Sequence, residues 1–91
     1  MKYEIRYGPA IDWKRFVKLP HKDKVRIKQA IERKLTTHPE IFGKPLRQSL
    51  RGCRSLRVGD YLVIFTIMGN IVEIRLFGHR STIYGESEGI L

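Results

Sequence analysis

The stretch that decides the fold runs from Cys53 to Phe77 and reads CRSLRVGDYLVIFTIMGNIVEIRLF. Two glycine-led pairs, Gly59-Asp60 and Gly69-Asn70, divide it into three runs that are rich in β-branched and aromatic residues. Such pairs favour tight hairpin turns, so the stretch predicts three consecutive antiparallel strands. The middle run, residues 61–68, is almost wholly apolar, which is typical of a central strand covered on both faces.

Alternation in the two outer runs indicates which side chains share a face of the sheet. In the first run, Leu56 and Val58 are expected on one face, with Ser55 and Arg57 on the other. In the last run, residues 71–77, the predicted apolar face consists of Val72, Ile74 and Leu76.

The N-terminal part of the chain predicts one strand and two helices. Residues 2–7 alternate polar and apolar side chains, as a half-buried strand does. Pro9 suits the first turn of a short amphipathic helix that ends near Leu19. A second helix with a clear apolar stripe is expected from Pro20 to about Thr37.

The remaining segments have weaker signals. Trp13, Phe16 and Val17 follow helical spacing and are expected in the core. Residues 38–49 are expected to form an irregular connection, and residues 81–84 a final strand or turn.

The element order β-α-α-β-β-β predicts an α+β fold in which a small antiparallel sheet carries two N-terminal helices on one face. The opposite face is then expected to be open and to hold a functional groove. With 91 residues, the chain is expected to form one domain, residues 1–91, ending in a mobile tail at 85–91.

The charge of the chain points to a polyanionic partner. Eighteen Lys and Arg against nine Asp and Glu give a net charge of +9. Residues 44–57 carry no acid, and their cations are Lys44, Arg47, Arg51, Arg54 and Arg57. Nucleic acid, an anionic membrane surface and an acidic protein all fit this charge, and so does a merely solvated basic surface.

Several classes of function have no support in the sequence. The longest apolar run, Leu62 to Met68, has seven residues, whereas a membrane span needs about 20. The N-terminus lacks the apolar core of a secretory signal, so a cytoplasmic location is expected. One cysteine and three scattered histidines make neither a disulfide nor a zinc site, so we expect no metal and no cofactor.

Three side chains have the chemistry for RNA cleavage. Hairpin pairing is expected to bring Arg57 near Arg80 and Tyr84, which follow the last strand. Guanidinium groups stabilise a phosphate as negative charge builds, and a phenol can accept a 2′-hydroxyl proton or stack on a base. Taken singly, Arg57 also fits a surface strand charge and Tyr84 a partly buried anchor.

These residues belong to motifs that resemble a known family. LRG at 50–52, LRVGDYLVIF at 56–65 and GHR at 78–80, followed by Tyr84, are similar to the signature of the RelE/ParE toxin superfamily. The resemblance implies a RelE-like fold and a toxin that is neutralised by a small cognate antitoxin wrapped around it. RelE-like members cut mRNA in the ribosomal decoding site, beside 16S rRNA, whereas ParE-like members block DNA gyrase. The stretch GHRSTIY resembles the RelE branch.

The resemblance also implies roles for individual residues. Arg80 matches the arginine that stabilises the transition-state phosphate, Tyr84 the proposed general base and stacking platform, and Arg57 a phosphate-binding position. His79 is a candidate for proton transfer. The expected RNA-binding residues are Lys44, Arg47, Arg51, Arg54 and Ser55.

Two positions depart from the family pattern. Many members have a basic residue where this chain has Ser55, and an arginine where it has Leu62. Taken as a whole, the resemblance implies a metal-independent, ribosome-dependent mRNA endoribonuclease, and the two departures point to weaker activity. A gyrase inhibitor and a catalytically weakened, antitoxin-binding member of the same fold are the alternatives.

Overall fold

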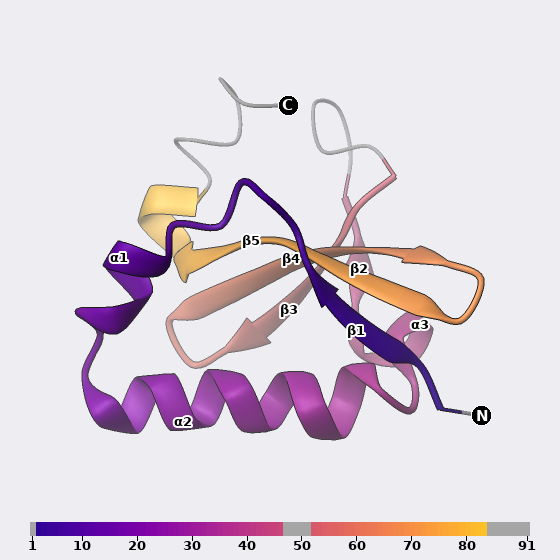
Figure 1. The fold of residues 1–91 in the computed structure, drawn as a ribbon, viewed down its shortest axis with the longest axis horizontal. Coiled ribbons are helices and arrows are strands. Elements are labelled where there is room, and N and C mark those ends of the chain that lie inside the picture. Colours follow the sequence, from indigo (N-terminus) through magenta and orange to yellow (C-terminus); the bar gives the residue numbers. More distant parts are fainter. Residues whose placement is uncertain (1, 47–51, 84–91) are drawn as a thin grey trace.

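The computed structural model describes residues 2–46 and 52–83, and in it a five-stranded sheet carries helices across one face (Figure 1). The strands are β1 (Glu4–Tyr7), β2 (Lys44–Pro45), β3 (Arg54–Val58), β4 (Tyr61–Met68) and β5 (Ile71–His79). The helices are α1 (Trp13–Val17), α2 (His21–Ala30), the π-helical turn η1 (Ile31–Leu35) and α3 (Pro39–Phe42). Residues 80–83 are also helical. The predicted tail at 85–91 lies outside the described residues.

The two predicted hairpins are confirmed. β3 pairs antiparallel with β4, and β4 pairs antiparallel with β5. Gly59 and Gly69 occupy the turns with φ of 62° and 60°, a region that glycine enters without steric cost. β4 is central in the sheet, and Leu62, Val63, Ile64 and Phe65 are all buried, as its apolar sequence predicts.

The first strand departs from the predicted antiparallel sheet. β1 lies beside β5 and runs parallel to it, with Glu4 opposite Ile71 and Tyr7 opposite Ile74. The sheet is therefore mixed, in the order β1-β5-β4-β3-β2. A tight turn fixes the direction of the strands it joins, but β1 and β5 are joined by most of the chain. Alternation within β1 therefore carries no information about its direction.

A bulge in β5 makes the prediction for its apolar face wrong. Phe65 lies opposite Ile74, but Ile64 lies opposite Leu76, so Arg75 is an extra residue in β5. One inserted residue moves every later side chain to the other face. Val72 and Ile74 therefore face the helices, while Leu76 faces the opposite side.

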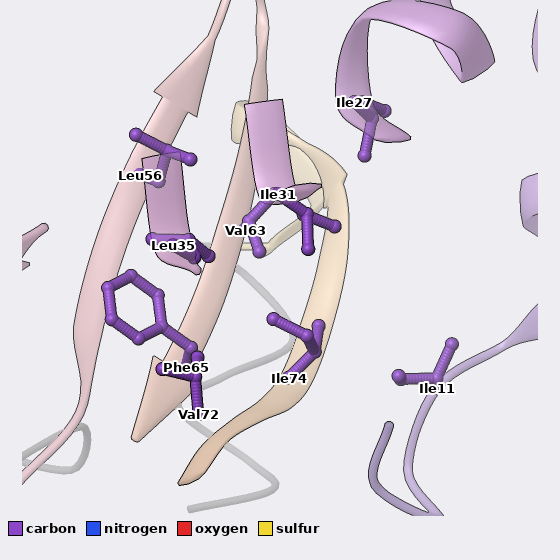
Figure 2. Close-up of a cluster of buried hydrophobic side chains, with 9 residues drawn as sticks. All are labelled: Ile11, Ile27, Ile31, Leu35, Leu56, Val63, Phe65, Val72 and Ile74. Carbon is purple, nitrogen blue, oxygen red and sulfur yellow. The ribbon is translucent and has the colours of Figure 1, made fainter. Parts of the chain in front are cut away.

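The main core lies between the helices and the sheet. Ile27, Ile31 and Leu35 come from α2 and η1 and point at the sheet, each with at most 2% of its surface exposed (Figure 2). They pack with Ile11, Leu56, Val63, Phe65, Val72 and Ile74. The second predicted helix is thus confirmed from His21 to Leu35, where its apolar stripe is buried.

The opposite face of the sheet is less open than expected. A second apolar cluster covers part of it and consists of Cys53, Leu62, Ile64, Leu76 and Ile83, with Leu46 packed against them. The helical turn at 80–83 brings Ile83 onto the sheet above Gly78, where a Cβ atom would lie 3.3 Å from Ile83 Cδ1. The absence of a side chain at Gly78 therefore allows this turn to pack.

The connection around α1 and α3 differs from the prediction in detail. The first helix begins at Trp13 rather than Pro9, because the Asp12 carboxylate caps it by accepting a hydrogen bond from the Arg15 N–H at 3.1 Å. The segment predicted as irregular contains α3 and the two-residue strand β2.

The expectation that all three apolar side chains of α1 belong to the core is wrong. Phe16 packs partly against the core, but Trp13 and Val17 are exposed. A helix of five residues is too short to lie across the sheet with its whole apolar side covered.

Candidate functional site

A row of paired residues places three predicted site positions on one face of the sheet. Arg57 in β3 lies opposite Leu62 in β4, which lies opposite Gly78 in β5. In β2, Lys44 lies opposite Ser55 of β3. Since directly opposed residues share a face, Lys44, Ser55 and Arg57 all lie on the side away from the main core.

Arg80 joins this group from the end of β5. Its backbone N–H donates a hydrogen bond of 2.9 Å to the carbonyl oxygen of Asp60, which ties the start of the helical turn to the β3–β4 hairpin. Arg80, Arg57, Ser55 and Lys44 line one hollow of about 360 Å³. The other lining residues are Lys34, Phe42, Leu56 and Leu62.

The hollow is strongly electropositive. Among residues 2–46 and 52–83, four cationic side chains and no carboxylate line it. The Arg57 Nε donates to the carbonyl oxygen of Gly59 at 2.9 Å, which fixes the plane of its guanidinium group. A preoriented guanidinium is well suited to a phosphate, because its forked donors match two phosphoryl oxygens.

A second hollow of about 400 Å³ continues the first along α2. It shares Lys34 and Arg57 with the first and adds Arg26 and Arg33. We call the two together the basic groove. Cations on a helix are usually solvated, so Arg26 and Arg33 were not among the predicted site residues, although their seven-residue spacing puts both on one side of the helix.

Two predicted site residues lie away from the basic groove. The Arg54 guanidinium donates through Nη1 to the carbonyl oxygens of Gly43 at 3.0 Å and Glu40 at 3.2 Å, so it holds α3 against the sheet. His79 pairs with Tyr61, and its Nδ1 lies 2.9 Å from the Ser81 hydroxyl oxygen. Tyr84, Arg47 and Arg51 lie outside the described residues.

The groove can bind and stabilise negative charge, but its described lining offers no obvious proton acceptor. No carboxylate, imidazole or phenol lines it among residues 2–46 and 52–83. The phenol of Tyr61 lies elsewhere and donates to the Asp23 carboxylate at 3.2 Å. Burial, together with this bond and the charge of Asp23, raises the pKa of Tyr61, so it stays neutral.

The described residues form neither a metal cluster nor a membrane-spanning helix. Within the described ranges, no three His, Cys, Asp or Glu side chains gather as a metal ion would require. In that part of the chain, no helix has the length and apolar character needed to cross a membrane.

Sequence comparison identifies the family. The model of the ParE toxin of type II toxin–antitoxin systems, parDE, matches residues 10–84. Over 69 residues the chain is 36% identical to the Toxin RelE of Mycobacterium tuberculosis, which corresponds to 74% of this chain and 71% of that protein. The chain therefore belongs to the ParE toxin family, within the RelE/ParE superfamily that its motifs predicted. It is a toxin of a type II toxin–antitoxin system.

Solved structures confirm the predicted α+β, RelE-like fold. The RelBE2 toxin–antitoxin complex of M. tuberculosis contains a chain that is 28% identical, with a TM-score of 0.78 over 89% of this chain and 94% of that one. YafQ from E. coli has a TM-score of 0.64 at 22% identity, over 92% of this chain and 100% of its own. RelE in the RelE–RelB complex of Pyrococcus horikoshii has a TM-score of 0.61 at 21% identity, over 88% and 97%. The last two similarities concern the fold alone.

Proposed function

We propose that this toxin is an endoribonuclease that cuts mRNA on the ribosome and is neutralised by a small cognate antitoxin. The observation that carries the proposal is the convergence of Arg57, Arg80 and Lys44 in one hollow, large enough for a phosphodiester, whose described lining has no carboxylate. The 36% identity to a protein named Toxin RelE supports the RNA-cleaving branch of the superfamily.

In the proposed reaction, the 2′-hydroxyl oxygen of one nucleotide attacks its own 3′-phosphate. The bond from phosphorus to the 5′-oxygen of the next nucleotide breaks, which leaves a 2′,3′-cyclic phosphate and a 5′-hydroxyl. One proton leaves the 2′-hydroxyl and one is taken up by the departing 5′-oxygen. Arg80 and Arg57 stabilise the extra negative charge on the phosphoryl oxygens, and electrostatic stabilisation of this kind is commonly worth 10²–10³ in rate per donor.

Proton transfer is assigned to Tyr84, as the family resemblance implies. Arginine stays protonated at any accessible pH and is a poor general acid. The ribosome contributes by holding the message in a reactive geometry, which lowers the entropic part of the activation barrier.

The test is expression of the chain in bacterial cells, with primer extension on cellular transcripts. The wild type should arrest growth and produce cuts in translated messages, whereas Arg80→Ala and Tyr84→Phe should relieve the arrest and remove the cuts. Lys14→Gln, on α1 and outside the lining of the basic groove, also removes one positive charge and is the control that should remain toxic. Arrest with intact transcripts would contradict the proposal.

Inhibition of DNA gyrase is the second candidate, and the match to the ParE family model favours it. It predicts loss of supercoiling by purified gyrase in the presence of the chain, with an induced DNA-damage response. A supercoiling assay beside the primer extension separates the two functions. A harmless wild-type chain that still binds the antitoxin would instead indicate a catalytically weakened member of the family.

A further inference from the structure

We propose that an apolar pocket at the corner of α1, β1 and β5 is an anchor site for an apolar side chain of the cognate antitoxin. This pocket is separate from the basic groove. The inference rests on the antitoxin partner of the proposed function and adds a location for it.

The pocket is built from aromatic rings. Trp13 contacts Tyr7, Phe16 and Phe77 edge to face, with ring centroids 5.4, 5.9 and 5.7 Å apart. Phe16 and Phe77 are 4.9 Å apart. With Ile27 and Lys28 these rings enclose about 190 Å³. A cavity of about 150 Å³ accommodates a benzene ring, so this one has room for a large aliphatic or aromatic side chain.

Two of the four rings that form the pocket are only about half covered. Trp13 and Tyr7 each expose 46% of their surface. Trp and Tyr are the residues most often found at the energetic centre of protein interfaces. Apolar surface of this kind on a small protein marks a place where another molecule binds.

The pocket and the basic groove lie on opposite flanks of α2. Ile27 is buried beneath the helix. Lys28 lines the pocket, whereas Arg26 and Arg33 line the groove. A ligand in the pocket therefore contacts the toxin without occupying the proposed phosphate site.

The chemistry of the pocket favours a polypeptide over a nucleic acid. Within the described part of the chain, Lys28 is the one charged residue that lines it, and Phe16, Ile27 and Phe77 line it with apolar side chains. Among the described lining residues, only Tyr7, Trp13 and Lys28 carry a side-chain hydrogen-bonding group. Most of the polar edge of a nucleobase inserted there would face apolar side chains and stay unpaired, which is costly. An aliphatic or aromatic side chain meets no such penalty.

The charges around the pocket indicate what flanks that side chain. Lys28 lines the pocket, and Lys24, one turn earlier on the same flank of α2, donates from Nζ to the Val17 carbonyl oxygen of α1 at 3.2 Å. Burial and the charge of Glu32, one turn after Lys28, raise the pKa of Tyr7, so this flank carries two lysines and one carboxylate. A partner segment with a carboxylate beside its apolar anchor is complementary to these lysines, and complementary charge steers association and fixes register. The proposed occupant is therefore an acidic segment of the antitoxin carrying one large apolar side chain.

The chain offers a direct reporter for this site, because Trp13 is its one tryptophan. The partner used is the product of the small reading frame that adjoins the toxin gene, prepared without tryptophan. On saturation with it, the full-length toxin should show a blue-shifted emission and at least a threefold drop in quenching by acrylamide. Unchanged emission and quenching in a formed complex would overturn the proposal.

Variants give a second measurement. Trp13→Ala should weaken antitoxin binding at least tenfold in titration calorimetry, and Trp13→Phe should retain most of the affinity. Val17→Ala is the matched control, since Val17 is also apolar and exposed on α1 but does not line the pocket. Circular dichroism of each variant verifies folding. Binding of Trp13→Ala within twofold of the wild type would contradict the proposal.

Two further outcomes separate this inference from the proposed function. If Trp13→Ala keeps full antitoxin affinity but loses toxicity, the pocket serves RNA or the ribosome and the inference is wrong. If the wild-type chain does not bind the adjoining gene product at all, the partner named in the proposed function is wrong, and the inference fails with it. RNA cleavage is measured separately, so its absence leaves the binding result intact.

Discussion

Lys44 and Ser55 lie directly opposite each other in the β2–β3 pair, so their side chains leave the same face of the sheet. In the family motif that this chain resembles, a basic residue often stands where this chain has Ser55. Opposed residues in an antiparallel pair have Cβ atoms about 4.5–5.5 Å apart, so a lysine on β2 reaches the same space as a lysine at position 55 would. Lys44 is therefore placed to supply, from the neighbouring strand, the positive charge that Ser55 does not carry.

Because Lys44 and Ser55 lie opposite each other, a lysine at position 55 should be able to replace Lys44. Lys44→Ala should lower the kcat/KM of RNA cleavage about tenfold, which corresponds to about 1.4 kcal/mol of transition-state stabilisation. Adding Ser55→Lys to Lys44→Ala should restore most of the activity, because both side chains line the same hollow. Lys44→Arg keeps the charge and serves as the control. Full activity in Lys44→Ala would show that this cation has no role.

The contrast between β3–β5 and the rest of the molecule shows what local sequence can predict. Hairpin turns at Gly59 and Gly69, together with a strongly apolar β4, determine pairing and direction without reference to distant parts of the chain. Alternation alone predicted that Ser55 and Arg57 share the face of the sheet opposite to Leu56, and this prediction is confirmed. The direction of β1 was not predictable, because its partner lies 67 residues further along the chain, as Glu4 and Ile71 show.

The candidate site was predictable only in part. Arg57, Arg80 and Lys44 were selected from motif and charge, and the structure brings them into one hollow. Lys34 and Arg33 were missed, since cations on a helix usually face solvent, and a groove along α2 exists only through packing against β3. The bulge at Arg75 had no signal in the sequence, because the segment alternates regularly on both sides of it.

The α2 flank of the basic groove should contribute to RNA affinity. Arg26→Gln and Arg33→Gln should each weaken binding of a short single-stranded RNA at low salt. Each should also reduce the slope of log affinity against log salt by about 0.7, the value for one phosphate contact on a single strand. Lys14→Gln removes a charge outside the groove and should leave the slope unchanged. Fluorescence anisotropy at several salt concentrations measures this, and equal losses in all three variants would indicate only a general effect of net charge.

The thiol of Cys53 should react slowly in the folded protein. It is buried, and burial raises its pKa above the ordinary value of 9.0, an effect that the charge of Arg75 partly opposes. The stability that depends on the neutral thiol is therefore present below the pKa of the unfolded chain and is lost as pH rises through the higher pKa of the folded state. In the folded protein, the rate at which Cys53 reacts with an aromatic disulfide should rise with pH, with a midpoint above 9.0. In denaturant, the midpoint should lie at a lower pH. Arg75→Gln should move the folded midpoint upward, and a downward shift would contradict the assigned cause.

Gly43 should tolerate no side chain, because the ring of Phe65 occupies the space where a Cβ atom would lie. That atom would overlap the ring tip and lie 2.9 Å from Phe65 Cε1, and Phe65 is fully buried in the main core. Overpacking of this kind costs about 1–3 kcal/mol, so Gly43→Ala should lower the free energy of unfolding in urea by that amount.

Phe65→Leu shortens the side chain at the point of overlap. Gly43→Ala should therefore cost less in a Phe65→Leu background than in the wild type. Gly69→Ala is the control, since it introduces strain at φ 60° without a neighbour within 4 Å, and its cost should be the same in both backgrounds. Additive losses for Gly43→Ala and Phe65→Leu would mean that the two positions do not compete for the same space.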